Sequence, residues 1–274
     1  MHQQKILAVN DLSSVGKCSL GVIIPILSAM KIEVCPVVTT ILSAHTGFEH
    51  PYIVDLSRHL DPMFAHILSE SSGFGFAYSG YLGSSQQMDI VKKHFETLKK
   101  SGTKILVDPV LGDHGKCYSA FDATSIEKMA QLCRIADLIT PNYTEACLLA
   151  NAPYQETESD EAVRLAGALS AALSVPSVVI TGVPLKTGKC IVVWENGKGS
   201  AIPCDYVKGE YSGTGDAFAS VLCGCLIKGE TLCDAVCKAH RFVRTAIRET
   251  DRMGGSPKEG IMVETFLHLL SEES

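Results

Sequence analysis

The 274-residue chain lacks any extended run of lysine and arginine, and its formal net charge is −6. Nucleic acids and anionic membranes attract clustered positive charge, so we expect neither as a partner. No secretory leader with a charged and an apolar region precedes Lys5. No apolar stretch reaches the roughly 20 residues that cross a membrane. The composition therefore predicts a soluble, cytoplasmic protein.

The chain also lacks the cysteine pattern of a secreted disulfide framework. Its 11 cysteines are odd in number and stand among apolar residues, which suits a reducing compartment. No internal repeat, low-complexity tract or linker interrupts the sequence. Hydrophobic residues make up 46% of it, enough for a large core. We therefore expect one domain over residues 1–274.

Apolar runs that end in polar residues alternate with helix-like segments over the first two thirds of the chain. Such runs are typical of parallel strands buried on both faces, and the alternation predicts a three-layer α/β/α fold with a central, mostly parallel sheet. Strands are expected at residues 5–10, 33–38, 74–79, 104–108, 137–142, 177–181, 189–194 and 200–204, and helices at residues 21–30, 62–69, 85–100, 123–134, 143–150, 161–173, 215–228, 231–249 and 262–270.

Local signals predict several boundaries. Asp61 before Pro62 reads as an N-cap followed by proline at the first helical position. Pro25 predicts a kink in its helix. Residues 39–52 are polar and rich in turn formers, and Gly197 favours a hairpin turn.

Residues 211–218 (YSGTGDAF) lead into an apolar helical run. Glycine takes positive φ without steric cost, so the N–H groups of Gly213, Thr214 and Gly215 can face an anion at a helix N-terminus. Asp216, in the first turn, is suited to accept a proton from an attacking hydroxyl. Taken alone, this segment is explained slightly better by an ordinary loop with an acidic N-cap. The dinucleotide-binding pattern fails, because Phe218 replaces its third glycine.

In open α/β sheets, ligands bind beyond the carboxyl ends of the strands. Asp108 and Glu145 follow two such ends and are candidate Mg²⁺ ligands, since hard cations take oxygen ligands. Asn142 and Glu145 are three residues apart, on one face of a helical turn. Strand-end capping would explain each residue alone. Together with the glycine loop, they favour a phosphate site.

Four motifs, in order, resemble the pyridoxal kinase branch of the ribokinase-like superfamily: residues 79–84 (SGYLGS), 108–113 (DPVLGD), 140–145 (TPNYTE) and 213–216 (GTGD). The resemblance covers nearly the whole chain. It implies ATP-dependent phosphorylation of the 5′-hydroxymethyl group of pyridoxal, pyridoxamine or pyridoxine, and a homodimer. It also implies that Asp216 is the base and that the amides of residues 213–215 form the anion hole.

On the ATP side, the same resemblance places Asp108, Asn142 and Glu145 against the Mg–ATP phosphates and Thr181 against the nucleotide. Residues 112–118 resemble the family's mobile flap, in which Lys116 is expected to meet phosphate charge. The flap also contains Cys117. Its thiol is a candidate for reversible addition to the 4′-aldehyde of pyridoxal, and an incidental loop cysteine is the alternative.

On the substrate side, Ser43, His45, Thr46 and Tyr81 match positions that surround the pyridine ring in the family. Asp11 stands where the family usually has a serine. A carboxylate there could pair with a pyridinium, a 4′-amine or a ring hydroxyl, which favours pyridoxamine or a pyrimidine. The alternative is that Asp11 only caps the following turn.

Two other patterns are rejected. Residues 15–19 (VGKCS) lack the first glycine and the Ser or Thr of a P-loop. The cysteines between residues 223 and 237, with His240, lie in predicted helices rather than a knuckle, so packing explains them better than zinc.

The expected mechanism is in-line transfer of the γ-phosphoryl group of ATP to a primary alcohol. The helix N-terminus is expected to lower the pKa of Asp216 and so to make it a weak base. A weak base is sufficient if the transition state is loose. The nearest rival is a hydroxymethylpyrimidine kinase. A sugar kinase is disfavoured, because no early Gly-Gly-x-Asn-like segment is present. A non-catalytic vitamin-binding or regulatory protein is the alternative from another class.

Overall fold

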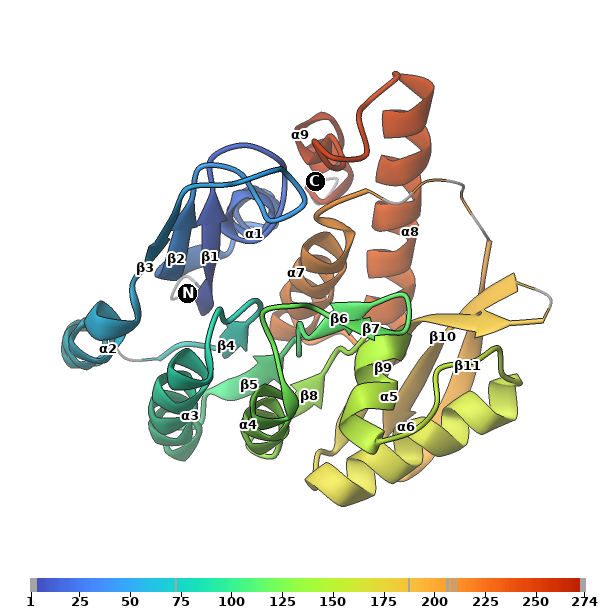
Figure 1. Cartoon of the computed structure of the whole chain (residues 1–274), viewed down its shortest axis with the longest axis horizontal. Helices are drawn as coiled ribbons and strands as arrows, with labels where there is room; N and C mark the ends of the chain where they lie inside the picture. Colours follow the sequence, from blue (N-terminus) through green and yellow to red (C-terminus); the bar gives the residue numbers. More distant parts are fainter. Residues whose placement is uncertain are drawn as a thin grey trace. The chain divides into compact units, whose positions relative to one another are not determined.

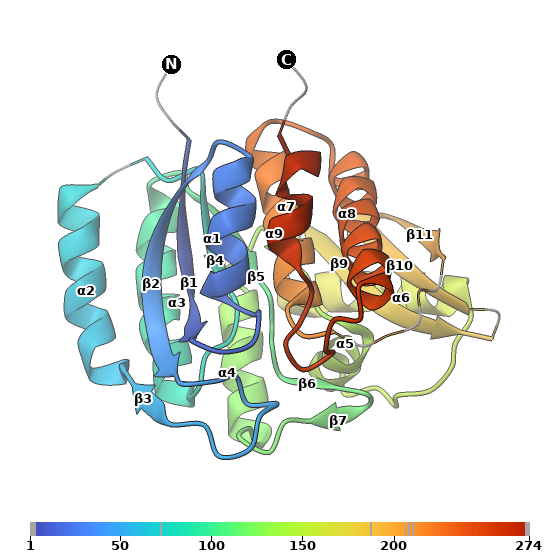
Figure 2. The ribbon, with the colours of Figure 1, turned by 90° about the horizontal axis from the view of Figure 1, so that it is seen from above.

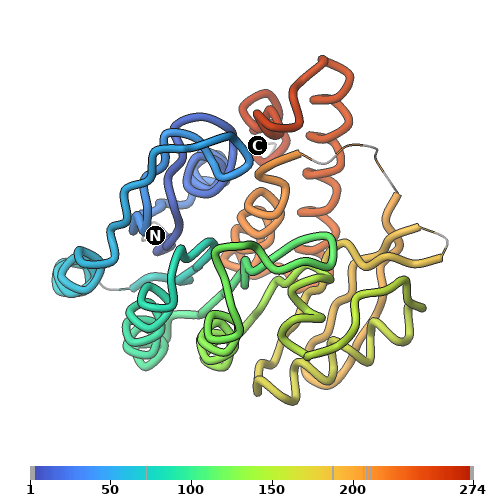
Figure 3. The backbone as a smooth tube through the Cα atoms, viewed as in Figure 1, coloured from blue at the N-terminus to red at the C-terminus, as the bar shows by residue number. Residues whose placement is uncertain are grey.

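The computed structural model describes residues 4–71, 73–186, 188–205, 207, 209 and 211–271. Its strands form a mostly parallel nine-stranded sheet flanked by helices (Figure 1), which confirms the predicted α/β class. The chain divides into two compact units, Met1–Gly80 with Val207–Ser274, and Tyr81–Tyr206. In Figure 3 the blue and red ends of the tube belong to the first unit and the green to yellow middle belongs to the second. One domain over residues 1–274 stays a prediction.

In the first unit, one buried strand is the centre of the sheet. Residues 6–9 of this strand are fully buried, because it has a parallel neighbour on each side and helices over its faces. The elements are β1 (Lys5–Ser13), α1 (Leu20–Ala29), β2 (Glu33–Leu42), β3 (Ile53–Asp55), α2 (Ser57–Glu70) and β4 (Phe76–Ser79). The helix after β1 and the helix after β3 lie on opposite faces of the sheet (Figure 1). Their connections run in opposite directions along the sheet, and right-handed crossovers then place the helices on opposite faces.

The C-terminal part of the first unit adds α7 (Thr214–Ile227), α8 (Leu232–Arg252) and the short α9 (Val263–Phe266). Figure 2 shows α1, α7 and α9 side by side. Gly224 of α7 lets α1 approach closely, since a Cβ atom there would stand 2.5 Å from Sδ of Met30. The C-terminal half of α7 therefore packs closely against the end of α1.

In the second unit, three parallel strands continue into an antiparallel hairpin. Its strands, in sheet order, are β5 (Lys104–Val107), β8 (Leu138–Ile139), β9 (Ser177–Leu185), β10 (Gly188–Glu195) and β11 (Lys198–Cys204). The helices are α3 (Ser85–Lys100), α4 (Ala123–Cys133), α5 (Tyr143–Ala150) and α6 (Ser159–Leu173), and a small separate hairpin is formed by β6 (Gly112–Asp113) and β7 (Lys116–Cys117).

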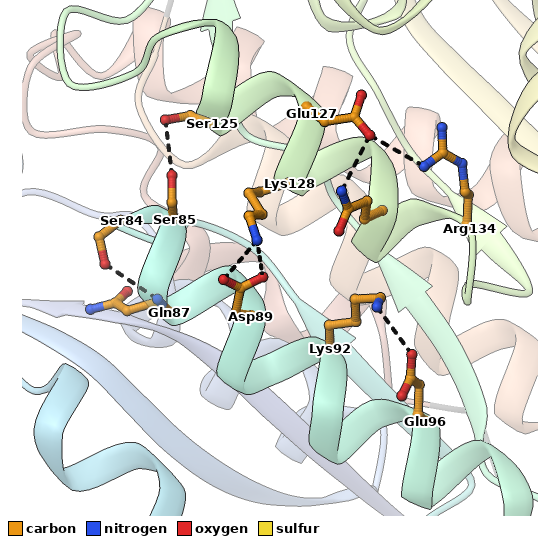
Figure 4. A network of polar contacts seen from close by, with 11 residues as sticks. Ser84, Ser85, Gln87, Asp89, Lys92, Glu96, Ser125, Glu127, Lys128 and Arg134 are labelled. Atoms are coloured by element: carbon orange, nitrogen blue, oxygen red, sulfur yellow. Dashed lines mark hydrogen bonds and ion pairs between the residues drawn. The ribbon is translucent and has the colours of Figure 1, made fainter.

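Exposed polar contacts join α3 and α4 (Figure 4). Between the two helices, Lys128 lies 2.9 Å from Asp89, and the hydroxyls of Ser85 and Ser125 lie 3.4 Å apart. Within α3, Lys92 pairs with Glu96. Exposed ion pairs contribute little stability. These helices are therefore held mainly by their buried apolar faces.

The prediction that a helix begins at Pro62 is wrong. The carboxylate of Asp55 accepts the backbone N–H of Ser57 at 2.8 Å, and α2 begins there, so Pro62 lies inside the helix. The turn-rich assignment of residues 39–52 is also partly wrong, because β2 continues to Leu42 and pairs with β3. The last predicted helix is shorter than expected and ends in a 3₁₀ turn, Leu267–Leu269.

Among the described residues, no helix is both long enough and apolar enough to cross a membrane.

Candidate active site

Asp216 lies in the first turn of α7, next to the C-terminal part of β1. Its Oδ1 accepts a hydrogen bond from the side-chain amide of Asn10 at 3.3 Å. Its Oδ2 accepts the backbone N–H of Ser19, the N-cap residue of α1, at 2.7 Å. The glycine loop before α7 therefore lies where open α/β sheets bind ligands.

The pKa of Asp216 is raised, not lowered. Burial raises it to about 7; the N–H of Ser19 and the amide of Asn10 act against burial, and the charge of Asp11 acts with it. The expectation of a lowered pKa is wrong because the carboxylate loses more by leaving water than it gains from the helix dipole. A carboxylate that titrates near neutral pH is a better general base than an ordinary aspartate.

Gly213 has a backbone conformation that suits only glycine. Its φ is +80°, and a Cβ atom would stand 2.4 Å from the backbone oxygen of Lys17. Gly260 packs against the same oxygen, with its own Cβ position 2.8 Å away. The N–H of Lys17 donates to the carbonyl of Glu259 at 2.8 Å. Three loops thus meet backbone to backbone and fix the start of α7.

The N–H groups of Gly213, Thr214 and Gly215 are available to a ligand. Helix α7 has no side-chain N-cap bond, and no hydrogen bond among the described residues uses these three donors. Such donors at a helix N-terminus attract anions. This arrangement agrees with the predicted anion hole, whose role stays a prediction.

Asp11 belongs to the same cluster and is only 4% exposed. Its Oδ2 accepts the hydroxyl of Ser13 at 3.1 Å, and its Oδ1 accepts the hydroxyl of Ser19. Burial raises the pKa of Asp11, while both hydroxyls and the nearby His45 lower it. Because the carboxylate accepts side-chain hydroxyls rather than N–H groups of the following turn, turn capping does not explain it.

His45 has both ring nitrogens bound within the protein. Nδ1 accepts the N–H of Gly47 at 3.0 Å, so we assign the proton to Nε2, which donates to the carbonyl of Lys258 at 2.7 Å. The hydroxyl of Ser43 accepts a backbone N–H at 2.8 Å, and Thr46 is exposed. Both ring nitrogens of His45 are therefore used within the protein, and the ring of Phe48 packs against it with centroids 4.9 Å apart.

In the second unit, the predicted nucleotide residues meet at the start of α5. Asn142 and Glu145 form a reciprocal capping box, with bonds of 2.9 and 2.8 Å. The other oxygen of Glu145 accepts the N–H of Leu111 at 3.1 Å. The amide of Asn142 donates to the carbonyl of Gly112 at 2.8 Å, and Thr181 pairs with Asn142 as a parallel bridge. Strands β5 and β8 thus end close to this point, and β9 passes it at Thr181.

Asp108 and Glu145 are both buried, at 8% and 3% exposed. Burial and the charge of Asp108 raise the pKa of Glu145 well above its usual range. Two carboxyls that repel each other fit a divalent cation, which would relieve the repulsion. Among the described residues no group of three or more His, Cys, Asp or Glu could hold a metal. Two carboxylates would leave most coordination positions of a bound Mg²⁺ to water, as is usual for this ion.

We expect Glu145→Ala to lower the free energy of unfolding by about 2–5 kcal/mol, because it leaves the buried N–H of Leu111 and the partly buried N–H of Asn142 without an acceptor. Urea unfolding measures the change. Glu127→Ala, which removes an exposed glutamate of α4, is the control and should leave stability unchanged. Equal effects of both substitutions would contradict the assigned role of Glu145.

The remaining predicted residues of the second unit lie on or near the β6–β7 hairpin. Lys116 is exposed in β7. The thiol of Cys117 donates to the carbonyl of Leu111 at 3.4 Å, and burial raises its pKa, which disfavours the thiolate that would attack an aldehyde. The ring of Tyr81 packs against Phe121 with centroids 5.9 Å apart. The substrate roles of Tyr81 and Cys117 stay predictions.

Sequence reasoning missed Ser19 and the segment around Gly260. Residues 15–19 do not match a P-loop, but the backbone N–H of Ser19, at the end of this segment, donates to Asp216. The 256–260 segment supports Gly213 and His45 through its backbone. The one available signal was the glycine at position 260, which has a φ of +85°. The 11 cysteines are all unpaired, as expected, and Cys223 and Cys225 are buried in α7.

The chain matches the family model described as phosphomethylpyrimidine kinase over residues 27–260. A crystal structure from Bacteroides thetaiotaomicron, assigned provisionally as a phosphomethylpyrimidine kinase and determined with pyridoxal, is 35% identical. Its TM-score is 0.93, and the likeness covers 100% of this chain and 97% of that one. Pyridoxal kinase from Lactobacillus plantarum is 33% identical, with a TM-score of 0.88 and coverage of 98% and 97%.

The hydroxymethylpyrimidine/phosphomethylpyrimidine kinase of Aquifex aeolicus is 28% identical over 63% of this chain and 68% of its own length. The chain spans only 58%, 63% and 64% of the length of three further curated relatives. The two crystal structures confirm the ribokinase-like fold and the resemblance to pyridoxal kinases.

Proposed function

This chain belongs to the phosphomethylpyrimidine kinase family, and we propose that it uses ATP to phosphorylate the 5′-hydroxymethyl group of pyridoxal, pyridoxamine or pyridoxine. The observation that carries the proposal is the whole-chain likeness, at 35% identity, to the B. thetaiotaomicron structure that holds pyridoxal. The cluster around Asp216 supplies chemistry that this reaction needs.

In the proposed mechanism, Asp216 orients the substrate hydroxyl and takes its proton as the oxygen attacks the γ-phosphoryl group. The N–H groups of Gly213, Thr214 and Gly215 stabilise negative charge on the group in transfer. Fixed hydrogen bonds from Ser19 and Asn10 hold the carboxylate in one orientation. A pKa of about 7 keeps it able to accept a proton at neutral pH.

We assign Asp108 and Glu145 to Mg²⁺, and Asn142, Thr181 and Lys116 to the phosphates of ATP. When bound, Mg²⁺ neutralises phosphate charge. The capping box of Asn142 and Glu145 gives the start of α5 a fixed geometry. On the substrate side, we assign the groups of Asp11, Ser43, His45, Thr46, Tyr81 and Cys117.

A hydroxymethylpyrimidine kinase is the second candidate. The family description and the A. aeolicus relative favour it. Asp11 is compatible with both candidates, because a buried carboxylate can accept hydrogen bonds from the amino group of pyridoxamine or of an aminopyrimidine. A non-catalytic vitamin-binding protein with this fold would form no ADP.

We expect at least one B6 vitamer to give a kcat/KM more than about tenfold above that of hydroxymethylpyrimidine, a difference of about 1.4 kcal/mol in transition-state binding. A coupled ADP assay with each of the four acceptors, ATP and Mg²⁺ measures it. ADP should form slowly when no acceptor is present. A higher value for the pyrimidine would favour the rival, and no ADP with any acceptor would exclude both kinases.

We also propose a cytoplasmic homodimer, on the strength of the resemblance to pyridoxal kinases. Light scattering of the purified chain tests the dimer.

A further inference from the structure

Two residues link Asp11 to Asp216. The side chain of Asn10 donates to Oδ1 of Asp216 at 3.3 Å and accepts the backbone N–H of Asp11 at 2.9 Å. Ser19 donates its backbone N–H to Oδ2 of Asp216 at 2.7 Å and its hydroxyl to Oδ1 of Asp11. The four residues form a closed ring of hydrogen bonds. Neither carboxylate can rotate without breaking a hydrogen bond of this ring.

Two further contacts make this ring rigid. The hydroxyl of Ser13 holds the second oxygen of Asp11 at 3.1 Å, so both oxygens of that carboxylate are bound. Gly80 leaves room for Asn10, since a Cβ atom there would stand 2.2 Å from its Nδ2. The position of the Asp11 charge relative to Asp216 is therefore fixed by the fold of the first unit.

The titratable groups near the ring are two acids, a thiol and an imidazole. Asp11 comes from β1, Cys18 from the loop before α1, and His45, which acts on Asp11, from the loop after β2. Lys17 pairs with Glu264 at 3.5 Å instead. No ion pair within the described ranges reaches either carboxylate of the ring. The charge of Asp11 therefore acts against ionisation of Asp216, while His45 acts on Asp11 in the opposite direction.

We propose that Asp11 is a positioning residue for the base: the ring of hydrogen bonds fixes its negative charge next to Asp216, where it adds to the effect of burial and makes Asp216 a stronger base. The proposal rests on the proposed function, because that function makes Asp216 the base. A like charge nearby disfavours the ionised form of a carboxyl group and so increases its basicity. The family's usual serine at this position would keep a hydroxyl but would not supply the charge.

The test is the pH dependence of kcat/KM, which reports groups in the free enzyme. In the wild type we expect activity to fall as pH drops below about 7, because Asp216 becomes protonated. In Asp11→Asn this acid limb should move to lower pH, because the variant removes a like charge that raises the pKa of Asp216. Asp234→Asn, an equal charge change at the exposed start of α8, is the matched control and should leave the limb in place.

A ¹³C NMR titration of the Asp216 carboxyl, assigned with Asp216→Asn, gives a second readout that needs no turnover. Its midpoint should fall in Asp11→Asn. Ser19→Ala, which loses the hydroxyl bond to Asp11 but keeps the N–H bond to Asp216, should give a smaller fall and serves if Asp11→Asn does not fold. Midpoints equal to the wild type would overturn the proposal. Absence of phosphorylation by the wild type would instead overturn the proposed function, and the titration would still decide the coupling.

Discussion

Asp216→Asn should lower kcat by about 10²- to 10⁴-fold, the usual contribution of a positioned general base. The amide has nearly the same shape as the carboxylate but cannot take the proton of the substrate hydroxyl. ATP binding should persist, because we assign the nucleotide to other residues. Steady-state kinetics with the best acceptor, together with calorimetric titration of ATP, measures both quantities.

A matched control separates this loss from a change of net charge. Asp234→Asn, at the exposed start of α8, should retain normal kcat. A near-normal kcat in Asp216→Asn would refute the assignment of the base, and a parallel loss of ATP affinity would indicate a damaged loop instead.

The pH dependence of stability gives an independent check on the same residue. The pKa of Asp216 is about 7 in the folded chain and near 3.8 in the unfolded chain, so the unfolded state releases this proton first. The wild type therefore loses stability as pH rises from about 4 through 7. In Asp216→Asn this part of the decline should be absent, while the raised pKa values of Asp11 and Glu145 still contribute in the same direction.

The fold was predictable where a local pattern and the tertiary structure agree. The helices predicted from residues 143 and 123 begin there in the structure, because Asn142 and Asp122 each cap their own turn. Pro62 shows the opposite case. The pair Asp61 and Pro62 looks like a helix start, but α2 already begins at Ser57, whose N–H donates to Asp55, and Leu60 and Phe64 bury the side of α2 that faces the sheet.

The sequence indicates residue types for the candidate site but not the contacts between them. The glycine pattern around Asp216 indicates an anion site because it reflects local backbone geometry. The bonds from Ser19 and Asn10, the support from Gly260 and the raised pKa of Asp216 all depend on segments about 200 residues away or on burial. No local pattern encodes those quantities.

The backbone of the glycine loop leads to a second large effect. Gly213→Ala should lower the free energy of unfolding by about 2–4 kcal/mol and kcat by at least about tenfold. An added Cβ atom would stand 2.4 Å from the carbonyl oxygen of Lys17 at a φ of +80°. A carbonyl oxygen cannot rotate away as a side chain can, so the start of α7 must move, and Asp216 moves with it.

Gly229→Ala is the matched control for Gly213→Ala. Gly229 follows the other end of α7 with a φ of +87°, and nothing lies within 4 Å of its Cβ position. Alanine at position 229 would have the same left-handed backbone strain, about 1–2 kcal/mol, without a clash like that with the carbonyl oxygen of Lys17. Urea unfolding and kcat, measured for both variants, therefore isolate the contact with Lys17. Equal losses in the two variants would mean that the positive φ alone explains Gly213 and that the start of α7 tolerates displacement.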